Sequence, residues 1–91
     1  MFKLENSEGG VNLTGIFIGK VVQNQDPKGL MRVEVTIPGL TDSNVSIWCD
    51  YCSPVKSSSG PIPSVGDYLY VMFRNPSDPM SAIYLGYVQA M

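Results

Sequence analysis

The stretch that decides the fold is PSVGDYLYVMFRNPSDPMSAIYLGYV, residues 63–88. It reads as turn, strand, turn and strand, with strands predicted at 68–74 and about 81–89. A half-buried strand alternates polar and apolar residues, but the first of these strands is apolar or aromatic on both faces. One face holds Leu69, Val71 and Phe73, and the other holds Tyr68, Tyr70 and Met72. We expect the first set to form core. We expect Tyr68, Tyr70, Met72 and Tyr84 to be half-buried in the monomer until a neighbouring subunit covers them.

The composition also indicates a covered surface. The 91 residues suffice for one domain. Charged residues make up 15% of the chain, against about 25% in typical soluble domains. Hydrophobic residues make up 44%, so part of the surface must be poor in charge. A surface that meets only water normally carries more charge, and we therefore expect a protein partner.

Charge and hydropathy disfavour other partner classes. Six basic residues oppose eight acidic ones, for a net charge of −2, and the basic residues form no run. Nucleic-acid binding draws on clustered phosphate contacts, so this charge distribution disfavours a nucleic-acid partner. No apolar stretch approaches the roughly 20 residues of a membrane helix. The N-terminal MFKLENSEGG lacks a signal-peptide core, so we expect synthesis and folding in a cytoplasm and no membrane partner.

The two cysteines, Cys49 and Cys52, form a CxxC motif. In an extended strand, residues three apart point to opposite faces, which favours neither a disulfide nor a shared metal. One CxxC supplies two of the four ligands of a structural zinc site, and the chain has no histidine. We expect two reduced thiols, no metal and no cofactor.

The first half of the chain divides into an arm, a strand and a turn. Residues 1–12 hold few apolar side chains and predict a flexible N-terminal arm, followed by a barrel domain over 13–91. Residues 14–25 predict a long first strand, in which the glycines mark a bulge or a bend. The DPKG sequence at 26–29 predicts a tight turn.

Two further strands follow. Residues 31–37 alternate cleanly and end at Pro38-Gly39, and residues 45–52 alternate around Trp48. Residues 53–66 are rich in Ser, Pro and Gly and predict a long loop. No segment shows a helical period.

These elements predict an all-β fold, a five-stranded OB-type Greek-key barrel. Closure removes the exposed edges of a small sheet. The glycine-punctuated first strand and the long loop between strands three and four favour the OB type. An SH3-like small barrel is the alternative on pattern alone.

The chain resembles a specific family, the OB domain of contractile phage-tail central hub and spike proteins, also found in VgrG tip proteins of type VI secretion. The resemblance covers about residues 14–90 and follows the family's series of a D-P turn, an R-V-x-V-x-I-P-G-like strand, a Trp-bearing strand, a P-x-V-G-D turn and a final D-P…G segment. The matching positions are Asp26-Pro27, Arg32-Val33, Ile37-Pro38-Gly39, Trp48, Pro63, Val65-Gly66-Asp67, Phe73, Asp78-Pro79 and Gly86.

The resemblance implies a structural component of a phage tail tip or baseplate hub, an adaptor joining the tail tube or hub to the central spike. Its partners would be hub, spike and tube proteins, and it would form a homo-oligomer, a trimer about the tail axis. Its place would be the virion, after assembly in the host bacterial cytoplasm. Because the sequence stops at Met91, where family members usually continue into a spike, we expect neither the needle nor a cell-wall hydrolase.

The residues also define two competing functions. A single-stranded nucleic-acid-binding OB module could stack bases on its aromatics, but the negative charge and the missing basic groove oppose it. An enzyme is excluded on sequence because no histidine, nucleophile motif, P-loop or paired carboxylates are present.

The candidate site residues therefore belong to an interface and to turns. The candidate protein-interface residues are Trp48, Tyr68, Tyr70, Met72 and Tyr84. The candidate structural turn residues are Asp26, Pro27, Gly29, Pro38, Gly39, Gly66, Asp67, Asp78, Pro79 and Gly86. We expect Trp48 to be a packing anchor, Arg32 a solvated or rim residue, and Gly86 a point of close backbone approach or of bending.

Overall fold

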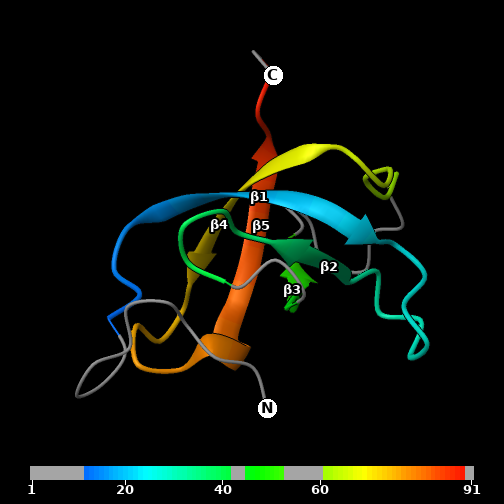
Figure 1. The fold of residues 1–91 in the computed structure, drawn as a ribbon. Coiled ribbons are helices and arrows are strands. Elements are labelled where there is room, and N and C mark those ends of the chain that lie inside the picture. Colours follow the sequence, from blue (N-terminus) through cyan, green and yellow to red (C-terminus); the bar gives the residue numbers. More distant parts are fainter. Residues whose placement is uncertain (1–11, 42–44, 53–60, 90–91) are drawn as a thin grey trace.

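The computed structural model describes residues 12–41, 45–52 and 61–89 (Figure 1). Of the N-terminal arm predicted at 1–12, only Asn12 lies within the described residues. Of the long loop predicted at 53–66, residues 53–60 lie outside them. No helix among the described residues is long and apolar enough to cross a membrane.

Five strands form a closed barrel in the order β1-β2-β3-β5-β4. Their bounds are β1 Ile16–Gln23, β2 Val33–Thr36, β3 Ile47–Tyr51, β4 Tyr68–Phe73 and β5 Ala82–Tyr87. Four of the five pairings are antiparallel, and the β3–β5 pairing is parallel. The all-β five-stranded barrel predicted from sequence is confirmed, and each strand is shorter than its predicted range.

Strand β1 pairs with two neighbouring strands, β4 and β2. Its residues from Ile16 to Lys20 pair with β4, and its residues from Lys20 to Gln23 pair with β2. The register with β2 shifts between Val21 and Gln23, which places a bulge in the strand. A bulge increases local twist and bends its strand. Figure 1 accordingly shows β1 as a long curved ribbon that crosses the front of the barrel.

At Gly19, strand β1 lies close against buried side chains of β2 and β4. A Cβ atom built on Gly19 would lie 2.9 Å from a Val35 methyl carbon and 3.2 Å from a Val71 methyl carbon. Such contacts are too short for packed carbon atoms. The glycine therefore lets β1 cross the core between β2 and β4 without a steric clash.

The core is a single apolar cluster drawn from all five strands and from the segment before β1. Leu13 is buried, and its backbone N–H donates to the carbonyl of Pro76 at 2.9 Å. Phe17 packs edge-on against Phe73, with ring centroids 5.7 Å apart. The fully or nearly fully buried apolar residues are Leu13, Val21, Val33, Val35, Ile37, Leu40, Ile47, Cys49, Leu69, Val71, Phe73, Ala82 and Tyr84.

Turns connect the strands where proline, glycine and aspartate gather in the sequence. The amide of Gly29 donates to the carbonyl of Asp26, beside Pro27, and that of Asp67 donates to Ser64, across Gly66. Leu40 donates to Ile37 across the Pro38-Gly39 pair. Each of these bonds closes a tight turn.

A short 3₁₀ helix, η1 (Pro79–Ser81), precedes β5 and was not predicted from the sequence. The side chain of Asp78 caps it by accepting a hydrogen bond from the Met80 amide at 2.9 Å. Pro79 occupies its first turn, where no backbone donor is needed.

Strand β5 contains an irregularity next to Gly86. Tyr70 pairs with Gly86 and Val71 pairs with Tyr84, so Leu85 is an extra residue on the β5 side. A Cβ atom on Gly86 would meet nothing within 4 Å. For Gly86 the sequence predicted either a close backbone approach or a bend. The close approach is wrong, whereas the strand is irregular at this point.

The two strand glycines give a matched test of the packing at β1. Because a methyl group on Gly19 would overlap Val35 and Val71, we expect Gly19→Ala to lower the free energy of unfolding by about 1–3 kcal/mol. Gly86→Ala adds the same methyl group in open space, and we expect a change within about 0.5 kcal/mol. Urea denaturation followed by Trp48 fluorescence measures both, and equal effects of the two substitutions would contradict the steric account.

Candidate protein-interaction site

The outer side of the barrel over β1, β4 and β5 is apolar. Two cross-strand rows build it, one through Ile16, Met72 and Ile83, the other through Ile18, Tyr70 and Gly86. Cross-strand partners point to the same side of a sheet, so these side chains share one surface. We call it the apolar face, and its residues are Ile16, Ile18, Tyr68, Tyr70, Met72, Ile83, Leu85 and Gly86.

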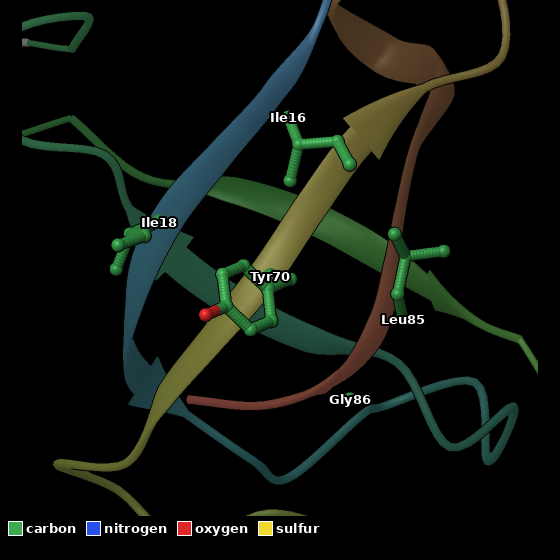
Figure 2. A pocket seen from close by; sticks show the side chains of 5 residues that line it. All are labelled: Ile16, Ile18, Tyr70, Leu85 and Gly86. Atoms are coloured by element: carbon green, nitrogen blue, oxygen red, sulfur yellow. The ribbon is translucent and has the colours of Figure 1, made fainter. Parts of the chain in front are cut away.

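A shallow groove of about 490 Å³ lies in the apolar face. Ile16 and Ile18 of β1 form one wall and Leu85 of β5 the other, with Tyr70 of β4 between them (Figure 2). Gly86 also lines the groove, and because it has no side chain the space beside the Tyr70 ring stays open. The groove can therefore accept an apolar side chain from another segment.

Several large side chains of the apolar face are well exposed to solvent. Ile16 is 62% exposed, Tyr70 41% and Leu85 42%. Single exposed apolar residues are common on protein surfaces, but a contiguous apolar patch marks a binding surface. Here the exposed residues are adjacent across three paired strands.

Charged groups border the apolar face but do not line its groove. Lys20 pairs with Tyr68 at one end of the β1–β4 ladder. At the other end Arg74 and Asp50 form a solvent-exposed ion pair at 3.5 Å. An apolar centre with a polar rim is the usual composition of a protein–protein interface.

The interface residues predicted on β4 lie on this face. Tyr68 and Met72 are half-buried in the monomer, as predicted, whereas Tyr70 is exposed and the prediction of its half-burial is wrong. Their coverage by a neighbour stays a prediction.

Tyr84 differs from the prediction that it is half-buried in the monomer. It is only 5% exposed, its hydroxyl donates to the carbonyl of Met31 at 3.0 Å, and burial raises the pKa of that hydroxyl. Tyr84 pairs with the inward-facing Val71, so it belongs to the core and the prediction of half-burial is wrong.

Sequence reasoning missed Ile16, Ile18 and Leu85 as members of the face. The signal for the first two was present, because residues two apart in a strand point to the same side. The outward position of Leu85 depends on the irregular β4–β5 register. No local sequence pattern predicts that register.

The opposite side of the barrel, over β2 and β3, has a different character. There the carboxylate of Asp26 organises the β1–β2 connection. It accepts backbone hydrogen bonds from Lys28 at 2.9 Å, Leu30 at 3.0 Å and Arg32 at 3.2 Å. The same loop contains Met31 with a positive φ of 62°, a conformation that costs energy for a residue other than glycine. The three bonds to one carboxylate hold the loop in that shape.

Arg32 completes this arrangement and is not the solvated rim residue that we expected. Its guanidinium donates to both carboxylate oxygens of Asp26, at 3.0 and 2.9 Å. It also lies 4.8 Å from the centroid of the Trp48 ring, in cation–π geometry. The indole is therefore packed against the arginine.

The stacked arginine bears on nucleic-acid binding. A base that stacked on the face of Trp48 that Arg32 covers would have to displace this arginine, whose charge is already paired with the Asp26 carboxylate. That face of the ring and the cation are therefore already engaged, whereas single-stranded nucleic acid needs both aromatic faces and cations for its contacts.

The charge state of Asp26 follows from these contacts. The side-chain hydrogen bond from Arg32, followed by the backbone amides, holds the pKa of Asp26 well below its ordinary value despite partial desolvation. The same pairing raises the pKa of Arg32. Because the folded state favours the carboxylate form, its stabilisation is complete above about pH 4 and is lost as the pH falls below that value.

The two thiols of the CxxC motif lie in different surroundings. Cys49 is buried in the core, Cys52 is exposed, and both are free. Burial raises the pKa of Cys49 to about 12. Within residues 12–41, 45–52 and 61–89, no three acidic or cysteine side chains gather in a way that could hold a metal ion.

The comparison with known families gives one finding. Residues 17–88 match the model of the type VI secretion system/phage-baseplate injector OB domain. The match runs from the second residue of β1 to the residue after β5, and so includes both sides of the barrel. No curated protein matches the chain.

The carboxylate of Asp26 predicts a specific pH dependence. We expect Asp26→Asn to lower the melting temperature at pH 7, because the amide cannot accept the five hydrogen bonds that the carboxylate accepts. As the pH falls from about 5 to 2, wild-type stability should decline towards that of the variant. Thermal melts followed by Trp48 fluorescence measure this.

A control variant is Asp67→Asn, which removes a carboxylate that accepts from the Ser64 amide and from no arginine. It should retain the wild-type decline at low pH. A gap between wild type and Asp26→Asn that stays constant from pH 7 to 2 would contradict the account.

The burial of Cys49 predicts that the two thiols react at different rates. At neutral pH a thiol reagent such as dithiobisnitrobenzoate should modify one thiol per chain rapidly, at Cys52. Cys49 should react only after unfolding, because its thiolate is disfavoured in the core. In Cys52→Ser no rapid reaction should remain, and two rapid thiols in the wild type would be the contrary result.

Proposed function

The chain belongs to the family of type VI secretion system and phage-baseplate injector OB domains, and from this premise we propose that it is an adaptor barrel joining the tail tube or hub to the central spike. Family membership makes it a structural component of the baseplate in the virion, and it confirms the expectation of a structural protein and not an enzyme. The adaptor role and the individual partners are our proposal.

The observation that carries the proposal is the apolar face. A closed barrel has no free edge to which a further strand could be added, so its strands can contact neighbours only through their outer side chains. On β1, β4 and β5 these are isoleucine, leucine, methionine and tyrosine, with an open groove among them. Aromatic residues and methionine are enriched in interface cores, and charged residues are depleted there.

The two sides of the barrel support different roles. On the β2–β3 side the polar groups satisfy one another through Asp26, Arg32 and Trp48. On the β1–β4–β5 side the apolar surface of the described residues meets solvent. We therefore assign the β1–β4–β5 side to contacts with neighbouring baseplate proteins or with copies of the same chain, arranged as a trimer about the tail axis.

The proposal is tested by the mass of the purified chain in solution, alone and with the neighbouring hub protein. Sedimentation equilibrium should show self-association or a hub complex. Tyr70→Lys and Leu85→Lys should each weaken that association at least tenfold, because a charge in the groove has no partner there.

The matched control is Leu30→Lys. Leu30 is 59% exposed but lies on the β1–β2 loop, outside the apolar face, so this substitution should leave association unchanged. A chain that stays monomeric at high concentration and binds no hub or spike protein contradicts the proposal, as does an equal loss in the control.

A further inference from the structure

We propose that the β1–β2 loop, residues 24–32, is a second docking element, which presents Leu30 to an apolar pocket bordered by a carboxylate on the central spike protein. The identity of this partner rests on the proposed function, because an adaptor must contact two neighbours. The apolar face accounts for the contact with the hub or with copies of the chain. The loop has the length, the rigidity and the exposed apolar side chain that a second contact requires.

The loop is longer than the joining of its two strands requires. Residues 24–32 connect the end of β1 to the start of β2, and the two strands are antiparallel neighbours. Connections of about two to five residues are the commonest in such hairpins. Figure 1 shows the additional chain as a loop that projects beyond the end of β1. Residues that the turn itself does not need are therefore placed where a neighbour can reach them.

Contacts on both sides of Leu30 hold the loop in one shape. The Asp26 carboxylate accepts a hydrogen bond from the Leu30 amide at 3.0 Å, beside those from two further loop amides. The carbonyl of Met31, the next residue, accepts a hydrogen bond from the Tyr84 hydroxyl at 3.0 Å. Because Tyr84 belongs to the core, this bond ties the loop to the barrel interior.

The backbone next to Leu30 is strained. Met31 has a φ of 62°, in the left-handed region that side chains other than glycine disfavour. Such a residue persists only where the surrounding contacts impose its conformation, and strained residues gather at sites that bind ligands or partners. Here the contacts hold the Leu30 side chain 59% exposed to water. A side chain that is already ordered loses little freedom when it binds, so the loop is prepared for a partner.

The charges of the loop indicate the border of the partner's pocket. Asp26 and Arg32 pair at 2.9 Å and neutralise each other, whereas Lys28 is exposed two residues before Leu30. An apolar pocket suits the leucine, and a carboxylate at its border attracts the lysine. No carboxylate lines the groove of the apolar face, so a second copy fits the loop less well.

The first test measures binding of the full chain to the purified spike protein and to the purified hub protein. Leu30→Asp should weaken spike binding at least tenfold, because it replaces the apolar anchor by a charge that the acidic border repels. It should leave self-association and hub binding unchanged, which also shows that the barrel is folded. Tyr70→Lys should have the reverse effects. Met80→Asp is the matched control, since Met80 is 70% exposed but lies on η1, and it should change none of these affinities.

The outcomes separate this inference from the proposed function. Spike binding that survives Leu30→Asp overturns the inference, as does a loss of self-association in that variant, which would make a second copy the partner. A wild-type chain that binds the hub but not the spike also overturns it and leaves the role of the apolar face intact. A chain that binds neither protein and does not self-associate contradicts the proposed function as well.

The acidic border is tested through Lys28. Lys28→Glu should weaken spike binding by about fivefold or more at low salt, and wild-type spike binding should fall as the salt concentration rises. Spike binding that is indifferent to both changes shows that no carboxylate borders the pocket and overturns the partner chemistry assigned to the loop.

The rigidity of the loop is tested without a partner by hydrogen exchange. In the wild type the Leu30 amide should exchange about tenfold or more slowly than in unstructured chain. In Asp26→Asn that protection should be lost, while the Val71 amide in β4 keeps its own. The same variant should bind the spike about threefold or more weakly, because the loop must then be ordered on binding. An unprotected Leu30 amide in the wild type, or full spike affinity in Asp26→Asn, overturns the inference.

Discussion

The whole barrel depends on the passage of β1 through two ladders. Its first half pairs with β4 and its second half with β2, and Lys20 takes part in both. The strand can pass so close to Val35 and Val71 only because residue 19 has no side chain. The same passage turns Ile16 and Ile18 outward beside Tyr70, so barrel closure also creates the apolar face.

The two outer sides of the barrel show how one small core supports two kinds of surface. On the β2–β3 side the polar groups bind one another within the chain. The Asp26 carboxylate accepts five hydrogen bonds, and Arg32 packs on Trp48. The β1–β4–β5 side offers apolar area with little polar content in its groove. A surface of the first kind gains little from a partner because its groups are already satisfied, whereas covering the second removes apolar area from water.

Much of the fold could be predicted because its signals are local. Alternation identified the core side of 31–37, and the Asp, Pro and Gly clusters marked the turns that hydrogen bonds now close. The site was less accessible because it depends on long-range register. The alternating pattern around Tyr84 does not say whether β5 is regular or bulged. Only the pairing of Tyr84 with the buried Val71 shows that its side chain points into the core. In the same way, no local pattern places Arg32 over Trp48, sixteen positions further along the chain, because the β2–β3 pairing brings them together.

The central claim is that the apolar face is the surface by which this barrel is built into a baseplate. A density map of the assembled tail tip, at a resolution that shows side chains, tests it most directly. The account predicts that Ile18, Tyr70 and Leu85 contact a neighbouring subunit and are excluded from solvent. It also predicts that Trp48 keeps Arg32 against its ring. A map in which the groove between β1 and β5 faces solvent, while the barrel is held through its β2–β3 side, would contradict it.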